Sequence, residues 1–192
     1  MVCKGSEMNT LFCLAQNIQK TFLRRKWQFC FIGGIALQRW GEPRLTVDVD
    51  ISLLTGFGNE EFFIDILCEK FVSRIENPRD FALDNRVLLL KSEDNIPIDI
   101  SLAGLPFEEE VIKRATDFFF LRKIALRTCS AEDMIIYKAF ADRGKDWADI
   151  EGILLRQEKL DWQHVEENLS LLAELKESPH IMPRLQNLRN KC

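Results

Sequence analysis

The sequence predicts an α+β fold in which a small mixed sheet, containing antiparallel strands, is flanked by helices and followed by a helical C-terminal part. Short apolar runs with strand-like alternation are interspersed with amphipathic helical segments in the first part of the chain. Two of those runs flank a cluster of turn-forming residues, which indicates an antiparallel hairpin. Near the C-terminus only helical periodicity is found. We therefore expect an α/β core over residues 1–128 and a C-terminal helical region, residues 129–192, packed on it.

Bulk composition limits the class of protein. At 192 residues the chain is long enough for one sizeable core with a small helical appendage. A net charge of −4 argues against binding of nucleic acid by bulk electrostatics, although it leaves room for a local basic patch. Six cysteines without a CxxC pair, and only two histidines, exclude zinc-ligand spacing. With neither a secretory signal nor a membrane-spanning apolar run, we expect a protein of the reducing cytoplasm with no membrane partner.

The first elements predicted are a helix, a buried strand, a glycine turn and a short helix. Apolar side chains recur at helical spacing over residues 7–26, and the basic run Arg24–Lys26 closes that helix. For this run a solvated helix end is favoured over a phosphate contact, because short charge runs usually lie in solvent. Residues 27–32 form an aromatic-rich strand, the pair Gly33-Gly34 ends it, and residues 35–40 make a two-turn helix.

A strand with two aspartates comes next. In residues 47–52 apolar and polar side chains alternate, which places Val47 and the two later apolar residues on one face. Asp48 and Asp50 therefore share the other face with Ser52. A solvated strand face is the simplest explanation, but two carboxylates close to a Gly-Gly turn are also typical of a site for metal and phosphate.

The middle of the chain predicts a loop, a helix and a hairpin. The loop spans residues 55–58, and an amphipathic helix follows at residues 59–72. Residues 86–91 and 96–102 flank a turn-forming cluster and form the hairpin. In its second strand Asp99 lies on the face opposite the isoleucines. A lone strand carboxylate usually faces solvent, yet a third carboxylate in step with the earlier pair is a candidate ligand.

The rest of the chain is predicted to be mostly helical. Residues 118–127 form one or two strands within the most basic stretch, residues 113–127. Ser130–Asp133 resembles a capping box and opens a helix that Gly144 ends. A short polar tail follows Pro183. The helices predicted here span residues 107–114, 131–143, 146–157 and 161–177.

Two features suggest phosphate and metal chemistry. The turn at Gly33 and Gly34 feeds a helix N-terminus and can present backbone N–H groups to phosphate oxygens, although such a pair is more often only a turn. Asp48, Asp50 and Asp99 offer the hard oxygen ligands that Mg²⁺ prefers. Two such ions, about 3.5–4 Å apart, activate an attacking hydroxyl and stabilise a leaving pyrophosphate. The three aspartates are therefore candidate metal ligands for two Mg²⁺ ions, with Mn²⁺ as a substitute.

In this order the motifs resemble the DNA polymerase β-like nucleotidyltransferase superfamily and, within it, the AbiEii-type nucleotidyltransferases. The resemblance depends first on the pattern Gly33-Gly34-x-Ala36 followed by Arg44-x-Thr46-x-Asp48-x-Asp50. A later helix with Glu132, Asp133 and Lys138 is similar too, as is the segment from Arg143 to Asp149. The similarity covers roughly residues 28–155 and implies a sheet of the nucleotidyltransferase type.

The resemblance implies a role for each residue of the first motifs. Gly33 and Gly34 would grip the triphosphate of an NTP, with ATP among the expected donors. Asp48 and Asp50 would hold metal. Asp99 would be the third metal ligand and the base for the incoming hydroxyl; it is assigned by strand phase and order, because no distinctive motif surrounds it.

The later motifs would bind the nucleotide from the helical region. Lys138 would bind the negatively charged triphosphate, and Asp149 (or Asp146) would complete the wall of the nucleotide site on the helical side. Without the resemblance, Lys138 is equally well explained as a surface residue, and the two aspartates as helix N-terminal acids. Arg44 and Thr46 belong to the nucleotide-binding pattern, although Arg44 is equally well explained as a cap of the local turn.

The expected activity is metal-dependent transfer of NMP from an NTP to an acceptor hydroxyl, with release of pyrophosphate. By resemblance to the toxin members of the family, the acceptor is an RNA end, tRNA among the candidates. The alternative is a small molecule, as in aminoglycoside-modifying relatives. A non-catalytic relative that only binds nucleotide is a third hypothesis, against which an intact set of carboxylates argues. An antitoxin protein is a further expected partner.

Overall fold

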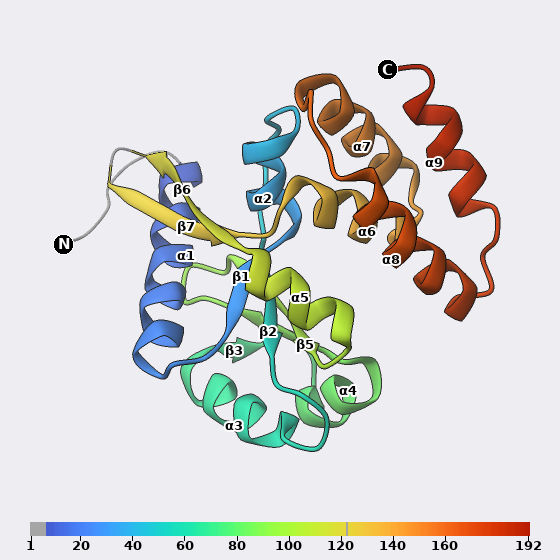
Figure 1. Ribbon diagram of the computed structural model, residues 1–192. Coiled ribbons are helices and arrows are strands. Elements are labelled where there is room, and N and C mark those ends of the chain that lie inside the picture. The colour runs from blue at the N-terminus through green and yellow to red at the C-terminus, as the bar shows by residue number, and fades with distance from the viewer. Residues whose placement is uncertain (1–6, 122) are drawn as a thin grey trace. The chain divides into compact units, whose positions relative to one another are not determined.

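The computed structural model describes residues 7–121 and 123–192 and divides the chain into two compact units (Figure 1). The first unit comprises the described residues up to Ile35 together with Leu45–Cys129. The second comprises Ala36–Arg44 and Ser130–Cys192. The boundary between them therefore falls inside one helix, α2 (Gly33–Trp40), as well as before the C-terminal helices. From the sequence a single division was expected, after residue 128, and none within residues 35–40.

In the described part of the first unit the strands form one mixed sheet with the order β3-β4-β5-β2-β1-β7-β6. The pairs β2/β5 and β1/β7 are parallel and the other pairs are antiparallel, so the mixed sheet predicted from the sequence is confirmed. The predicted hairpin is formed by β4 and β5. The strands are β1 (Phe29–Phe31), β2 (Val49–Leu54), β3 (Val72–Ser73), β4 (Val87–Lys91), β5 (Pro97–Ala103), β6 (Thr116–Leu121) and β7 (Ile124–Thr128).

The helices of the first unit are α1 (Glu7–Arg24), α3 (Glu60–Lys70), α4 (Pro78–Asn85) and α5 (Pro106–Arg114). Helices α1 and α3 bury their apolar stripes against the strands, as their helical periodicity predicts; Ile18, Phe22 and Ile64 are almost fully buried. The helix predicted over residues 59–72 ends at Lys70, and its predicted last residue, Val72, begins strand β3. Helix α4 lies in a stretch to which the sequence patterns assigned no element. Helix α5 packs against β1 and β2.

Two local predictions at the centre of the sheet need correction. Strand β2 begins at Val49, so Val47 is outside the sheet and its side chain is 63% exposed. The strand therefore begins two residues later than predicted, and Asp48 also precedes it. Ser52, which was expected to share the face of the aspartates, is fully buried. In addition, Gly33 and Gly34 are the first residues of α2 rather than a turn that precedes it. The glycines thus place the helix N-terminus directly after β1.

The second unit consists of the later residues of α2 and the helices α6 (Ala131–Ala141), α7 (Gly144–Arg156), α8 (Trp162–Leu175) and α9 (Ile181–Arg189). Helix α6 contacts α7, α8 and α9. Its predicted N-cap is confirmed, because the Ser130 hydroxyl accepts the N–H of Asp133.

The C-terminal predictions were partly wrong. Helix α6 ends in a left-handed residue, Asp142, and Gly144 begins α7 instead of ending α6. The predicted polar tail is the helix α9, which buries Ile181 and Leu185. Pro183 is compatible with it because the first helical turn needs no internal N–H donor. Across the described residues we find no helix with the length and apolar character that crossing a bilayer requires.

Candidate active site

The first glycine of α2 lies directly against Asp50 of β2. Gly33 has a φ of +57°, and a Cβ placed on it would lie 1.8 Å from Oδ2 of Asp50. The backbone N–H of Gly34 donates to the same oxygen at 3.4 Å. Because both the left-handed conformation and the short approach need a residue without a side chain, Gly33 is required for the carboxylate to sit at the start of the helix.

The second glycine makes room for Thr46, which in turn positions Asp48. A Cβ on Gly34 would lie 2.1 Å from Thr46 Oγ1. Thr46 is buried, and its hydroxyl donates to Oδ1 of Asp48 at 3.0 Å. Thr46 also lines a pocket of about 430 Å³ between α1 and the β4–β5 hairpin. The two glycines therefore bring both aspartates of the Asp-x-Asp motif to one end of β2.

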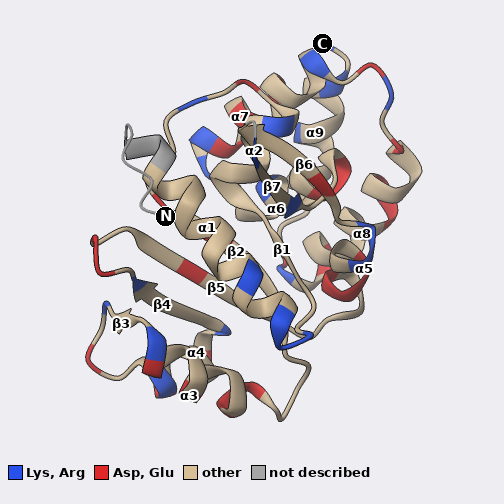
Figure 2. Ribbon diagram, turned by 90° about the vertical axis from the view of Figure 1, so that its left-hand side faces the viewer, with Lys and Arg blue, Asp and Glu red and all other residues tan. Residues whose placement is uncertain are grey.

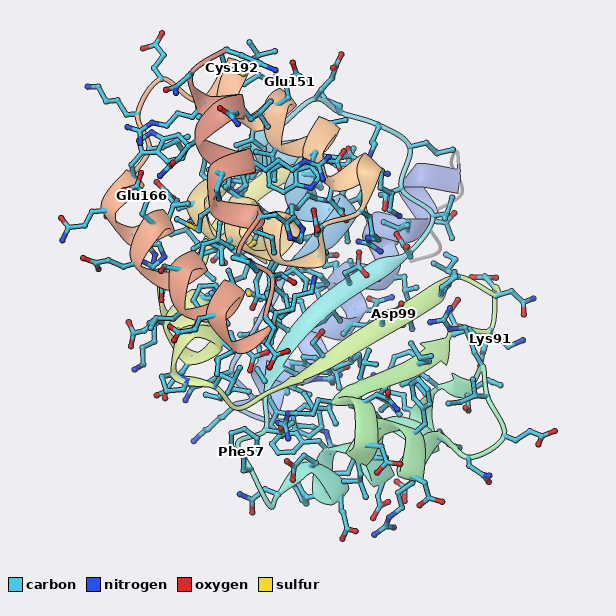
Figure 3. All side chains as sticks on the ribbon, turned by 90° about the vertical axis from the view of Figure 1, so that its right-hand side faces the viewer. Phe57, Lys91, Asp99, Glu151, Glu166 and Cys192 are labelled. Carbon is cyan, nitrogen blue, oxygen red and sulfur yellow. The ribbon has the colours of Figure 1, made fainter. Side chains whose placement is uncertain are left out.

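Asp99 joins this group through strand register. It pairs with Asp50 across the parallel strands β2 and β5, and Figure 3 shows it on β5 beside β2. Partial burial raises the pKa of the Asp99 carboxyl above its usual value; the Arg74 guanidinium opposes this and the negative charge of Asp48 adds to it. Asp48 directly precedes β2, and Asp50 and Asp99 pair across β2 and β5, so the three aspartates lie along two adjacent strands. Their joint role as one site stays a prediction.

The detailed arrangement differs from a ready-made metal centre. Carboxylate oxygens fit Mg²⁺ chemically. Among the described residues, however, no three Asp, Glu, His or Cys side chains are grouped so as to hold a metal ion. Asp99 instead forms an ion pair with Arg74, a residue that follows β3. The donor set suits a divalent cation, but Arg74 occupies one of the three expected ligands.

Arg74 was missed in the sequence because it lies outside every predicted element. Its backbone N–H donates to the carbonyl of Leu89, and Leu89 is paired with Asp99 on β5. The arginine therefore belongs to the same row of the sheet as Asp99 and Asp50. No local pattern could have revealed that row, because it depends on pairing between residues far apart in the chain.

A second group of the predicted residues lies in the second unit, around Lys138 of α6. Lys138 is buried, so its interpretation as a surface residue is wrong. Its Nζ lies 3.0 Å from Asp146 Oδ1 and 2.6 Å from Asp149 Oδ2. The motif offered Asp149 or Asp146 as alternatives, and both carboxylates contact the lysine.

Two arginines complete this cluster. Arg44 donates two hydrogen bonds to the carboxylate of Asp149, each at 3.1 Å, and Arg143 Nε donates to Asp146 at 2.6 Å. Burial by itself would raise the pKa of both aspartates, but the hydrogen bonds and charges of the lysine and arginines outweigh it and hold each pKa below its usual value. Three cations thus meet two ionised carboxylates, and the cluster carries net positive charge.

Comparison with known proteins places both groups inside one family match. The family described as nucleotidyl transferase AbiEii toxin, type IV toxin–antitoxin system, matches residues 14–171. No curated protein sequence matches the chain.

Solved structures share the fold at low sequence identity. An antigenic nucleotidyltransferase-like protein from Paracoccidioides brasiliensis is 13% identical, with a TM-score of 0.51 and 92% of each chain covered. The antibiotic-resistance factor ANT(2'')-Ia is 16% identical, with a TM-score of 0.53, and the match covers 93% of this chain and 97% of that one. At this identity the likeness establishes the fold.

Proposed function

This chain belongs to the AbiEii nucleotidyl transferase family and is a nucleotidyltransferase, and we propose that it transfers NMP from an NTP to a hydroxyl group of RNA. In that reaction the acceptor oxygen bonds to the α-phosphorus, the bond to the β-phosphate oxygen breaks, and pyrophosphate leaves. The observation that carries the proposal is the contact of Gly33 with Asp50, which sets a helix N-terminus and a carboxylate beside each other.

Each residue of the first cluster has a chemical role in this proposal. The backbone N–H groups at the start of α2, at Gly33 and Gly34, bind phosphate oxygens, since a helix N-terminus favours anions. The N–H of Gly34 donates to Asp50 Oδ2 in the structure, so it becomes available to phosphate when Asp50 turns to the metal. Thr46 holds the Asp48 carboxylate in place through its hydroxyl. Asp99 accepts the proton of the acceptor hydroxyl, a role that suits a carboxyl group whose pKa is raised.

We further propose that Mg²⁺, with Mn²⁺ as a substitute, is held by Asp48 and Asp50. When bound, such an ion would neutralise part of the negative charge of the phosphates. The positive cluster of the second unit, with Arg44 and Lys138 beside Asp149, is suited to binding the anionic nucleotide. The family description also leads us to propose that an antitoxin counteracts the protein in the cytoplasm of its host.

A small-molecule acceptor is the second candidate. The pocket of about 430 Å³ that Thr46 lines has the size of a site for a drug-sized molecule. An apolar hairpin residue, Ile96, and the exposed side chains of Leu45 and Val47 contribute to its wall. This pocket is the observation that favours a compact acceptor.

The test is a transfer assay with α-³²P-labelled NTPs. The protein is incubated with Mg²⁺ or Mn²⁺, each NTP in turn, and either total RNA or a panel of small hydroxylated molecules. Label in RNA supports the first candidate and label in a small molecule supports the second. If no label is transferred while NTP binding is intact, the protein is a non-catalytic relative and both candidates fail.

A matched pair of variants tests the site assignment. Asp48→Asn/Asp50→Asn is expected to abolish transfer, because it removes two carboxylates of the cluster at constant size. Asp65→Asn/Asp117→Asn changes two exposed aspartates that form surface ion pairs, and it is expected to keep full activity. Transfer that survives in the first variant would overturn the assignment.

A further inference from the structure

A basic site is present at the C-terminal end of α1, in a pocket that none of Asp48, Asp50 and Asp99 lines. A pocket of about 530 Å³ is lined there by Lys20, Thr21 and Arg24 of α1 and by Lys70 of α3, among others. Lys70 Nζ donates to the Thr21 hydroxyl at 2.6 Å, which joins the two helices. We call Lys20, Arg24, Arg25, Lys26 and Lys70 the α1–α3 basic site. Figure 2 shows the blue segments of Lys and Arg toward this end of α1.

The charges of this site lack carboxylate partners. Among the residues whose side chains are described, 10–121 and 123–192, none of these five side chains forms an ion pair with Asp or Glu. Partial burial lowers the pKa of Lys70, and the positive charges of Arg24 and Arg25 lower it further. Several positive charges therefore repel one another at this place, and an anion that binds there relieves the repulsion.

The predicted basic stretch at residues 113–127 provides a contrast. Lys113 forms ion pairs with Glu109 and Glu110, and Arg127 pairs with Asp117. Arg122 of the same stretch lies outside the described residues. From the sequence, the basic run at the end of α1 was expected to lie in solvent. It is nevertheless a better candidate for binding an anion than residues 113–127, because its cations have no such neutralising partners.

Aromatic side chains accompany the basic site. The guanidinium of Arg25 lies 5.4 Å from the ring centroid of Trp27, and Trp27 packs edge-on against Phe62, with centroids 6.4 Å apart. Phe62 is 58% exposed. Cations combined with accessible aromatic rings are typical of surfaces that bind the backbone and the unpaired bases of a nucleic acid.

The length of α1 sets the size of ligand that can use both sites. Leu11, near the start of α1, lines the same pocket as Thr46, which contacts Asp48. Arg24 lies thirteen positions after Leu11 in the sequence, about 20 Å along a helix at about 1.5 Å per residue. A compact ligand that fills a pocket of several hundred Å³ is on the order of 10 Å across and cannot span this distance. A nucleic acid strand whose bases are stacked as in a duplex has a phosphate at roughly every 3.4 Å and spans this distance in about six nucleotides.

We propose that the α1–α3 basic site is a docking site for the sugar–phosphate backbone of the RNA acceptor, placed about six nucleotides from the end that reacts. This inference rests on the proposed function, since it concerns the acceptor of that reaction. The basic site distinguishes an RNA acceptor from a small-molecule acceptor, because only RNA is long enough to reach it, and it lies outside the catalytic residues. The docking site determines which acceptors bind well, while the carboxylate cluster carries out the transfer.

The test measures binding of a fluorescein-labelled 20-nucleotide single-stranded RNA by anisotropy, without NTP and over a series of salt concentrations. For Lys20→Ala/Arg24→Ala/Lys70→Ala we expect at least tenfold weaker binding at low salt. The slope of log K against log salt should fall by about 2, because each lost phosphate contact accounts for about 0.7. The charge-preserving variant Lys20→Arg/Arg24→Lys/Lys70→Arg should bind within threefold of the wild type.

A matched control removes the same charge elsewhere. Lys113→Ala/Lys159→Ala/Lys191→Ala changes three exposed lysines outside the site and should bind RNA within twofold of the wild type. Equal binding by the two alanine variants would overturn the docking site. The same proteins are tested for co-sedimentation with phosphatidylserine vesicles. If the basic-site variant lost vesicle binding but kept RNA binding, the docking site would also be overturned, because the surface would then be a membrane contact. Circular dichroism checks that all variants are folded.

The transfer assay distinguishes failure of the docking site from failure of the proposed function. If the basic-site variant labels RNA as efficiently as the wild type, the docking site is wrong and the proposed function stands. If RNA binding depends on the basic site but no label ever enters RNA, the docking inference holds and the proposed reaction fails.

Discussion

Gly33 and Asp50 are in such close contact that a single added carbon on the glycine would lie 1.8 Å from the carboxylate. The two residues belong to consecutive elements of the sheet region, α2 and β2, and are joined by a helix and a loop. The contact brings a negatively charged side chain to the positive end of a helix dipole. It therefore couples the phosphate-binding backbone to one of the candidate metal ligands.

Gly33→Ala is predicted to lower transfer activity at least a hundredfold. The added Cβ displaces Asp50, and a displacement on the order of 1 Å in an active site can cost about a hundredfold in rate. The left-handed φ of +57° also disfavours alanine by about 1–2 kcal/mol. Transfer rate and urea unfolding are measured together.

Gly58→Ala is the control for backbone strain. Gly58 has a φ of +84°, and a Cβ placed there meets no atom within 4 Å. Its substitution is expected to cost similar stability with no loss of activity. If both variants lost activity equally, strain rather than contact with Asp50 would be the cause.

Arg74→Ala is predicted to strengthen binding of divalent metal. The arginine is ion-paired with Asp99, which pairs across the sheet with the proposed metal ligand Asp50. Removing the arginine takes a positive charge away from the metal site and leaves the negative charge of Asp99 beside it. We expect the dissociation constant for Mn²⁺, measured by electron paramagnetic resonance, to fall several-fold. Arg79→Ala, which removes surface ion pairs with Glu61 and Asp65, should leave it unchanged. Unchanged Mn²⁺ affinity in the first variant would mean that the charge of Arg74 does not influence the metal site.

Lys138→Met is predicted to destabilise the second unit by about 3–5 kcal/mol, because it leaves Asp146 and Asp149 without their shared buried cation. The free energy of unfolding in urea at pH 7 is the measurement. Lys113→Met removes exposed ion pairs on α5 and should cost no more than about 1 kcal/mol. If Lys138→Met lowered the free energy of unfolding by no more than Lys113→Met does, the arginines alone would satisfy the two carboxylates.

The stability of the protein is predicted to fall in acid partly through Asp146. Its folded-state pKa is below the usual value of 3.8, so the ionised carboxylate stabilises the fold above about pH 4. This contribution is lost as the pH falls from about 4 through the folded-state pKa. Unfolding free energies measured between pH 2 and 6 should therefore depend less on pH in Asp146→Asn than in the wild type. Asp65→Asn, on the surface, should keep the wild-type slope.

Much of the fold could be predicted because its signals are local. Alternation in β5 and the turn-forming residues before it predicted the hairpin with β4, and helical periodicity predicted α1 and α6. Helix α9 was missed because Pro183 and polar neighbours hide a pattern of only two buried apolar residues. Strand β3, with two residues, is too short for any alternation to appear.

The residues of the candidate site also divide into those that local patterns revealed and those that they did not. By itself the sequence determined that Gly33, Gly34, Asp48 and Asp50 belong together, because a glycine pair and an alternating acidic strand are short-range patterns. The tertiary structure decided what each distant partner does. It paired Asp99 with Arg74 and buried Lys138 between two aspartates. It also left the cations at the end of α1 without carboxylate partners among the described residues. Such pairings depend on strand register and helix packing between residues far apart in the chain, and no local pattern encodes them.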